Sequence, residues 1–384
     1  MTIEALANAS SVGGTTIKDI RDGRTPSPRK ETLEKLSSAL GVTYESLLSD
    51  PNPHIYDGTN RSYTSEYGPS ASSALRFGNF RTLYLCYDVL ESSAYDPENL
   101  LIRITRGKIP VSDKFEAVRK AMASENKKRR KKGDGKKTWW DGPALALKSF
   151  QIEMTEDGVE EKNIKLNVVK SSYSYSVAAK SDGLSLLRKS ALKRFHFLDQ
   201  PIPWLTFGLG VSGVVFINGG SHFLACKRSQ LETHRSGEYD VSFAEGILAA
   251  KDCTDKNKNL LSPYKTATRA VKEELGITPR ERDIQIFSFG CDLEYYQWGY
   301  MADITTDLSF DEAHLCWQSS KDRFETSELF QVEATPEAAA SYISQNPIWS
   351  FGVANLYYCL RRRSDDPRHV DRVFIEALRS NSCE

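Results

Sequence analysis

Two adjacent carboxylates, Glu273 and Glu274, are the side chains in this 384-residue chain whose types and spacing best suit a chemical task. Arg269 precedes Glu273 by four residues, so on a helix these two side chains would share a face. Mg²⁺ in proteins is commonly held by one or two carboxylates together with substrate phosphates. We therefore expect Glu273 and Glu274 to be metal ligands for Mg²⁺, and the catalytic residues if the chain is an enzyme, with Arg269 in the ligand site.

The segment 262–276 carries the end signals of a helix that would position these groups. Ser262 is suited to the N-cap, Pro263 to the first helical position, and Gly276 to a left-handed stop. Positions 270, 273 and 274 share one helix face, but position 270 is an alanine, so only two acids remain there. The alternative is an ordinary amphipathic helix with both glutamates in water. The residues expected to point to the core are Ala267, Val271 and Leu275.

This segment resembles the Arg-Glu-x-x-Glu-Glu-x-Gly core of Nudix proteins, whose acidic helix holds Mg²⁺ against a diphosphate. Arg269, Glu273, Glu274 and Gly276 are in register, and Ala270 stands where the family has its first carboxylate. The resemblance implies a pocket for a pyrophosphate-containing ligand. The missing carboxylate implies that such a ligand is bound more readily than it is cleaved.

The spacing upstream departs from the family pattern. Gly246 stands where the Nudix box begins, but it precedes Arg269 by 23 positions instead of roughly 14. We therefore expect an insertion of roughly nine residues, held as a surface loop by the polar run 252–259. The family's acid, roughly eight residues before the arginine, falls on Leu261.

The flanking sequence fits the same resemblance over residues 205–362, for which we expect an α/β/α Nudix-like domain. Apolar runs at 212–217 and 221–226 predict two strands around the turn Gly219-Gly220, followed by the basic pair Lys227-Arg228. Arg228 is a further candidate ligand residue. The segments 295–302 and 329–332 predict further strands, and 336–344 predicts a helix.

The N-terminal residues 1–50 predict helix, turn and helix at 2–8 and 15–22, and they resemble the lambda-repressor-like (Cro/CI-type) DNA-binding domain. Its small core would consist of Leu6, Ala7, Val12, Ile17 and Ile20. In that family the second helix enters the major groove of double-stranded DNA and the heads dock as pairs, which implies a homodimer. The residues that this places on DNA are Thr15, Thr16, Lys18, Arg21 and Arg24.

The net charge of residues 1–50 leaves a second interpretation open. Six Lys and Arg face seven Asp and Glu, so non-specific attraction to DNA would be weak. A helical module that binds protein is the alternative.

A linker at 51–79 and a separate α+β unit at 80–200 are expected between these parts. Strands are predicted at 82–87, 100–104, 144–147 and 164–169, and helices at 114–124 and 184–195. The basic run 127–132, expected as a loop, leads to Trp139 and Trp140, which could attract phosphates and stack a base. The alternative is a solvated loop beside two core tryptophans. Two further candidates for the wall of the ligand cleft are Tyr173 and Tyr175.

Composition excludes several classes of protein. The 51 basic and 51 acidic residues balance, which argues against a nucleic-acid coat or a membrane-surface protein. No apolar stretch is long enough to span a bilayer and no signal-peptide core is present, so we expect a cytoplasmic protein without membrane contact. The seven cysteines are scattered and read as reduced thiols.

Together these features predict a multidomain chain with an all-α helix-turn-helix head, an α+β middle unit, an α/β/α Nudix-like domain and a C-terminal tail at 363–384. The predicted function is a ligand-responsive transcription regulator that senses a nucleoside diphosphate derivative such as ADP-ribose or a nucleotide sugar. One alternative is an active Mg²⁺-dependent Nudix hydrolase with a targeting head. Another is a protein-interaction scaffold. The residues that could supply the hydrolase with its missing carboxylate are Glu294, Glu312, Glu325 and Glu328.

Overall fold

The computed structural model describes residues 3–21, 29–40, 71, 73–132, 138–154, 162–196, 200–230, 235–254 and 259–379. The chain divides into two compact units, Met1–Ile55 and Tyr56–Glu384. Each unit is described by itself below.

The first unit contains three short helices, α1 (Ile3–Ser10), α2 (Gly14–Arg21) and α3 (Lys30–Leu40). Val12, Ile17 and Leu36 form its buried core, with Ile3, Leu6, Ala7 and Ile20 packed against them. This confirms the small core predicted from the sequence. Residues 41–55 of this unit lie outside the described residues.

The second unit is built around an eight-stranded sheet. The order along it is β14-β8-β7-β13-β12-β3, with β10 paired to β7 and β9 paired to β8. β13 runs parallel to β7, and the other pairs are antiparallel. The strands are β3 (Tyr84–Val89), β7 (Gly208–Ile217), β8 (His222–Arg228), β9 (Tyr239–Val241), β10 (Phe243–Gly246), β12 (Ile284–Asp292), β13 (Gln297–Thr305) and β14 (Thr326–Glu333).

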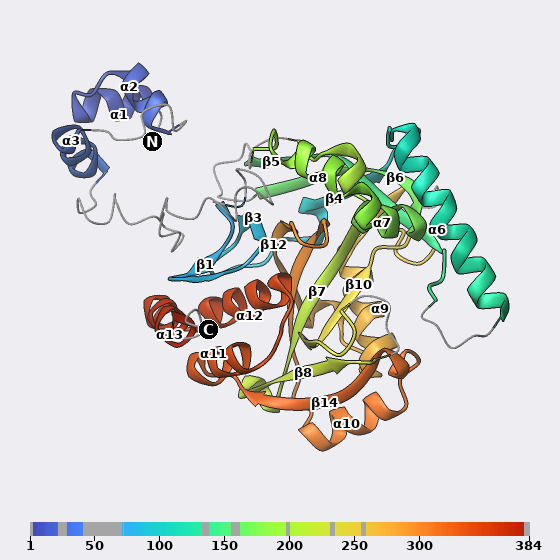
Figure 1. Cartoon of the computed structure of the whole chain (residues 1–384). Coiled ribbons are helices and arrows are strands. Elements are labelled where there is room, and N and C mark those ends of the chain that lie inside the picture. The colour runs from blue at the N-terminus through green and yellow to red at the C-terminus, as the bar shows by residue number, and fades with distance from the viewer. Residues whose placement is uncertain are drawn as a thin grey trace. The chain divides into compact units, whose positions relative to one another are not determined.

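Helices cover both faces of this sheet because its central strands alternate apolar side chains between two cores. On β7, Leu209, Val211 and Val215 enter one core and Val214 and Phe216 the other. Two helices pack in the first core, α9 (Pro263–Leu275) and α10 (Phe310–Gln318). The second takes α11 (Pro336–Gln345), α12 (Ser350–Arg363) and α13 (Pro367–Arg379), on the opposite side of the sheet (Figure 1).

A second, four-stranded sheet has the order β11-β4-β6-β5. One face packs on α6 (Asp113–Lys132), α7 (Tyr173–Lys180) and α8 (Ser185–Leu192). Its other face shares a core with the large sheet and α9. Its strands are β4 (Leu100–Ile104), β5 (Pro143–Met154), β6 (Lys162–Ser172) and β11 (Leu260–Leu261). A two-stranded hairpin, β1 (Arg76–Phe77) and β2 (Phe80–Arg81), and short 3₁₀ turns complete the unit: η2 (Pro97–Asn99), η3 (Asp182–Leu184), η4 (Pro203–Leu205), η5 (Asn218–Gly220), η6 (Glu281–Asp283) and η7 (Arg323–Glu325).

The structure differs from the sequence expectation in how residues 80–200 are used. They were expected as a separate unit, but β3 is an edge strand of the large sheet, paired with β12. Conversely β11, from the range 205–362 that was expected to form a domain of its own, pairs with β4 of the small sheet. Strand pairing between distant segments is set by tertiary packing, which local sequence patterns do not report.

Two further expectations are corrected. Residues from 363 onward were expected as a tail, but 367–379 form α13, whose Val370, Phe374 and Leu378 recur at helical spacing and are buried. The basic run 127–132 was expected as a loop, but it forms the last turns of α6. Lys and Arg have good helix propensity, and their charge favours a helix C-terminus. In the described part of the chain, no helix is long and apolar enough to cross a membrane.

Candidate functional site

The helix that carries Glu273 and Glu274 has the ends predicted from the sequence. The Ser262 hydroxyl accepts a hydrogen bond from the Lys265 N–H at 3.4 Å, and Pro263 is the first residue of α9. Gly276 ends the helix with a φ of 70°. A Cβ there would lie 2.2 Å from the carbonyl oxygen of Cys316, so this glycine also allows α10 to pack closely on α9.

Arg269, in the middle of α9, is the centre of a largely buried hydrogen-bond network. Its Nε and Nη2 donate to the two carboxylate oxygens of Asp252, each at 2.9 Å, and Nη2 also donates to the Gly246 carbonyl at 2.7 Å. Burial alone would lower the pKa of Arg269, but Asp252, Glu245 and Glu273 outweigh it and raise the pKa. This pairing ties α9 to the segment that follows β10.

Asp252 is the partner that sequence reasoning missed. It is fully buried, and it also accepts hydrogen bonds from the Thr266 hydroxyl at 2.9 Å and the Leu248 N–H at 2.8 Å. The signal was its position six residues after Gly246, which is the spacing that the family pattern implies. Counting back from Arg269 instead placed the acid on Leu261, because the insertion follows Asp252.

Glu273 is surrounded by cations. Its carboxylate accepts hydrogen bonds from Lys251 Nζ at 2.9 and 3.1 Å, Lys321 Nζ lies 3.0 Å away, and Arg269 Nη1 lies 3.4 Å away. Burial would raise the pKa of Glu273, but the hydrogen bonds from Lys251 and Lys321 outweigh it and lower the pKa to about 2. The side chain is therefore neither free in water nor aimed at an open coordination site.

Glu274 turns into a different environment. Its Oε1 is buried and has no hydrogen-bond partner among the described residues. Burial, and then the nearby carboxyl groups of Glu245 and Glu325, raise the pKa of Glu274 well above its usual value, against a lowering effect of Arg228. Burial likewise raises the pKa of Glu245. Burial in this pocket therefore favours the protonated form of both carboxyl groups more than water does.

These donors do not fit Mg²⁺. Within the described ranges, no group of three or more His, Cys, Asp or Glu side chains is placed to hold a metal ion. Among the alternative donors, Glu325 lies close enough to Glu274 to raise its pKa. Glu312 instead caps α10, where its carboxylate accepts a hydrogen bond from the Ser309 hydroxyl at 2.8 Å. The charge of Glu294 raises the pKa of Asp292, and Glu328 is exposed on β14.

An open cleft of about 870 Å³ lies along the outer side of α9, where basic side chains predominate. Lys265 is fixed by a hydrogen bond to the Cys253 carbonyl at 2.7 Å. Ammonium and guanidinium groups that converge on one cleft suit a phosphate-bearing ligand. The lining residues are Lys251, Lys265, Thr268, Arg269, Lys272, Glu273, Gly276, Glu281, Ser319, Ser320 and Lys321.

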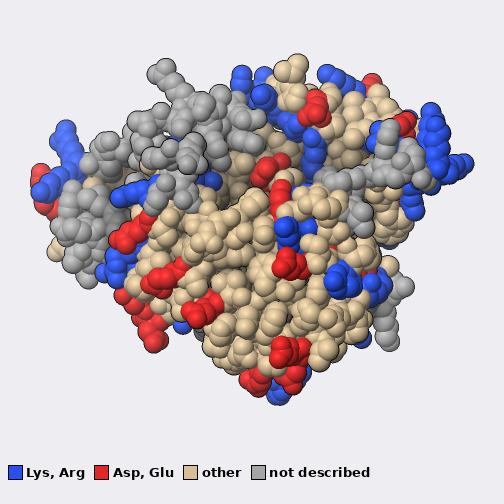
Figure 2. All heavy atoms as spheres, turned by 60° about the horizontal axis from the view of Figure 1, so that its bottom comes forward, with Lys and Arg blue, Asp and Glu red and all other residues tan. Residues whose placement is uncertain are grey.

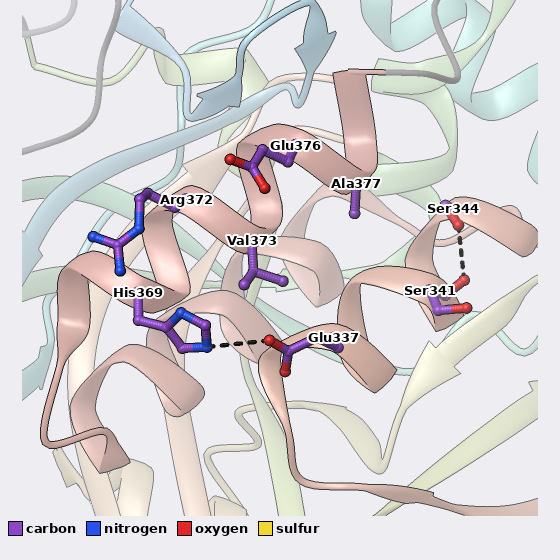
Figure 3. A pocket seen from close by; sticks show the side chains of 8 residues that line it. All are labelled: Glu337, Ser341, Ser344, His369, Arg372, Val373, Glu376 and Ala377. Carbon is purple, nitrogen blue, oxygen red and sulfur yellow. Dashed lines mark hydrogen bonds and ion pairs between the residues drawn. The ribbon is translucent and has the colours of Figure 1, made fainter.

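A second hollow lies between α11 and α13 (Figure 3). His369 Nε2 and Glu337 Oε1 face each other across it at 3.1 Å. Arg372 and Glu376 also line it, and Ser344 turns to the Ser341 carbonyl at 2.9 Å. Its charges are mixed, so it shows no preference for an anionic ligand.

The other predicted ligand residues lie in different parts of the second unit. Arg228 lies near Glu274, at the end of β8. Trp139 and Tyr173 pack together with ring centroids 6.0 Å apart, and Tyr175 packs on Phe207 at 4.8 Å, within the core of the small sheet. Trp140 is exposed.

Four of the five predicted DNA-contact residues, Thr15, Thr16, Lys18 and Arg21, lie on α2. Thr15, Thr16 and Lys18 are exposed, whereas Ile17 is buried, so the three polar side chains share the outer surface of the helix. The side chain of Arg21, the last residue of α2, and all of Arg24 lie outside the described residues.

No protein-family model matches the sequence, and no curated protein matches it. Among solved structures, the chain is similar to the protein DR0079 of Deinococcus radiodurans, with 11% identity and a TM-score of 0.30 over 40% of this chain and 83% of that one. It is also similar to the Nudix domain of Shewanella oneidensis NrtR in complex with ADP ribose, with 14% identity and a TM-score of 0.29 over 41% of this chain and 88% of that one.

Proposed function

We propose that this chain is a ligand-responsive DNA-binding regulator whose Nudix-like part binds a nucleoside diphosphate derivative of the ADP-ribose or nucleotide-sugar class. One observation carries the proposal. The carboxylate of Glu273 is already held by Lys251, Lys321 and Arg269. Protein cations thus stand where a catalytic site would need a metal, which favours binding of a diphosphate over its cleavage.

The cleft along α9 supplies the chemistry for such a ligand. Lys251, Lys265, Lys272 and Lys321 present ammonium groups around the hydroxyls of Thr268, Ser319 and Ser320. Charge-assisted hydrogen bonds from these groups to phosphate oxygens need no bridging metal. Arg269, fixed by Asp252, would position the helix rather than move with the ligand.

The first unit supplies the DNA contact in this proposal. The exposed Thr15, Thr16 and Lys18 of α2 would meet base edges, and Arg21 and Arg24 would meet phosphates. Heads of this kind dock on palindromic sites as pairs, so the functional state is a homodimer. Ligand binding regulates DNA binding only if it favours one arrangement of the dimer over another.

Thermal unfolding with ADP-ribose or UDP-glucose in EDTA tests the ligand site. The expected result is a rise in Tm that persists without metal, because the lysines bind the diphosphate directly. A ligand at a hundred times its Kd stabilises the folded state by about 2.7 kcal/mol. The variant Lys251→Met/Lys321→Met should lose the shift, whereas Lys189→Met/Lys193→Met, on exposed residues in and after α8, should keep it.

Two results would overturn the binding proposal. Absence of any shift with every nucleoside diphosphate compound would leave no ligand role for the cleft. Mg²⁺-dependent hydrolysis that Glu274→Gln abolishes would instead assign the chain to the active hydrolases, because a pure sensor does not depend on that carboxyl group for turnover.

A gel-shift titration with the chain's own promoter region tests the DNA contact. Arg21→Ala should weaken binding to all sequences alike and flatten the dependence on salt by about one unit, as expected for one lost phosphate contact, whereas Lys18→Ala should relax the sequence preference. Lys35→Ala is a matched control, because Lys35 pairs with Glu31 on α3 at 2.8 Å. Salt-independent binding, or none, would favour a protein-interaction module.

A further inference from the structure

The C-terminal end of α6 carries an unusual density of positive charge. Residues 127–132 are all Lys or Arg, and all but Arg129 are exposed. Arg129 pairs with Glu125 at 3.1 Å, whereas the other five form no ion pair with another described residue. Lys and Arg side chains gather at this edge of the molecule in Figure 2.

The beginning of α6 is firmly anchored, so this charge is presented from a fixed base. Phe115 is buried, with its ring stacked on Tyr175 at 6.1 Å and in edge contact with Trp204 at 6.0 Å. Glu116 and Arg119 form a close pair at 2.6 Å. The basic turns therefore project from a helix whose first turns pack on the core of the small sheet through Phe115.

Asn126 fastens the segment 139–142 to α6 where the basic run begins. Its amide group donates to the Trp139 carbonyl at 2.7 Å and accepts from the Trp139 N–H at 3.0 Å. The Gly142 carbonyl accepts from the Tyr173 N–H at 3.0 Å, which fixes the other end of the segment. The two tryptophans are thus held beside the basic turns.

The two tryptophans then serve different purposes. Trp139 is half-buried against Tyr173, whereas Trp140 is 65% exposed. A Cβ at Gly142 would lie 1.9 Å from the Trp140 ring, so the indole rests directly on the glycine backbone. An indole that is positioned by the backbone and yet exposed is a ready platform for stacking.

We infer that the end of α6 and Trp140 form a binding surface for single-stranded nucleic acid. The lysines and arginines neutralise successive phosphates, and the indole stacks on an unpaired base. A duplex would offer the indole no unpaired base. A lipid surface fits less well, because the residues of 123–132 are polar or charged except for Ala123, which leaves no apolar face to enter a bilayer.

This surface is independent of the proposed function. It lies on the small-sheet side of the second unit and includes no residue of the α9 cleft or of α2. Its failure would leave the ligand and duplex-binding proposals untouched, and the reverse also holds.

Fluorescence anisotropy with labelled oligo-dT and oligo-U, on the full chain, tests the surface. Trp140→Ala should weaken binding about tenfold, the loss expected for one base stack, and Trp140→Phe should retain most of the affinity. Lys127→Ala/Lys128→Ala should flatten the dependence of log K on log salt by about 1.4, because each phosphate contact on a single strand contributes about 0.7.

The controls separate this surface from general electrostatics. Lys189→Ala/Lys193→Ala removes the same charge elsewhere and should leave binding unchanged. Equal affinity for oligo-dT and oligo-U indicates a contact with phosphates and base faces. A preference for one of the two indicates whether single-stranded DNA or RNA is the target. Equal losses in both charge variants, no effect of Trp140→Ala, or tighter binding to phosphatidylserine vesicles would overturn the inference.

Discussion

The α9 cleft and the end of α6 are both rich in lysine and arginine, but they use that charge in opposite ways. Around α9, Arg269 and Lys251 are bonded to acids of the same chain, Asp252 and Glu273. On α6, five exposed cations have no acidic partner among the described residues. The comparison teaches that a basic sequence run indicates little until the structure shows which charges are already satisfied inside the protein.

Arg269→Met should give the largest change of any single substitution in this comparison. It leaves Asp252 buried without its cation, and breaking a buried pair in this way costs about 3–5 kcal/mol. Urea denaturation would measure the free energy of unfolding. Arg130→Met, on the exposed end of α6, is the control and should change it by less than about 0.5 kcal/mol. Similar losses of unfolding free energy in both variants would contradict the difference in charge pairing between the two regions.

Asp292 sharpens the comparison, because it is as deeply buried as Asp252 but forms no ion pair with a cation of the described residues. Its Oδ1 accepts from the Tyr295 N–H at 2.7 Å, and its Oδ2 has no partner among the described residues. Burial, and secondarily the charge of Glu294, raise the pKa of Asp292 to about 7. The folded protein thus binds this proton more tightly than the unfolded chain does.

The consequence is a pH-dependent stability. Because the folded pKa lies above the unfolded value, stability falls as pH rises from about 4 to about 7 and then levels off. Asp292→Asn removes this loss, so its stability relative to the parent should rise by about 2–4 kcal/mol across that window. Parallel unfolding curves at pH 4, 5.5 and 7 would measure it. A constant difference across pH would show that Asp292 titrates normally.

Lys251→Met and Lys321→Met probe the cations on Glu273. Without their hydrogen bonds the pKa of Glu273 should rise from about 2 toward its ordinary value. Carbon-detected NMR titration of labelled glutamate would follow this change. The stability that these exposed lysines contribute, present at neutral pH and lost as pH falls toward 2, should be at most about 1 kcal/mol. If the pKa of Glu273 does not change in these variants, the two ammonium groups do not contact its carboxylate in solution.

Lys131→Ala should have the smallest effect. The side chain is exposed and has no acidic partner among the described residues, so the free energy of unfolding should change by less than about 0.5 kcal/mol. Thermal unfolding would detect a larger loss. Such a loss would mean that the end of α6 is held by internal contacts after all, as the α9 cleft is.

Local signals predicted α9 well, whereas long-range pairings escaped prediction. Ser262, Pro263 and Gly276 act within one helix, so their sequence order alone sets its ends. The Arg269 pair with Asp252 spans 17 positions across an insertion. The pair could be predicted from the sequence only if the insertion was placed after Asp252.

The two tryptophans show the same limit. Sequence alone left open whether they belong to the core or to a surface. The division between half-buried Trp139 and exposed Trp140 depends on Asn126, whose contact with Trp139 crosses 13 positions. Likewise, nothing local in 84–89 indicates that this segment pairs with β12, some two hundred residues later.

The position of β3 at the border of the large sheet has a practical consequence. Trimming the chain to residues from 205 onward would remove β3 and uncover the backbone N–H and C=O groups of β12 that it now pairs. An unprotected border strand invites pairing with other molecules and aggregation. Shortened versions of this protein should therefore retain residues 73–92 or carry a charged substitution on β12.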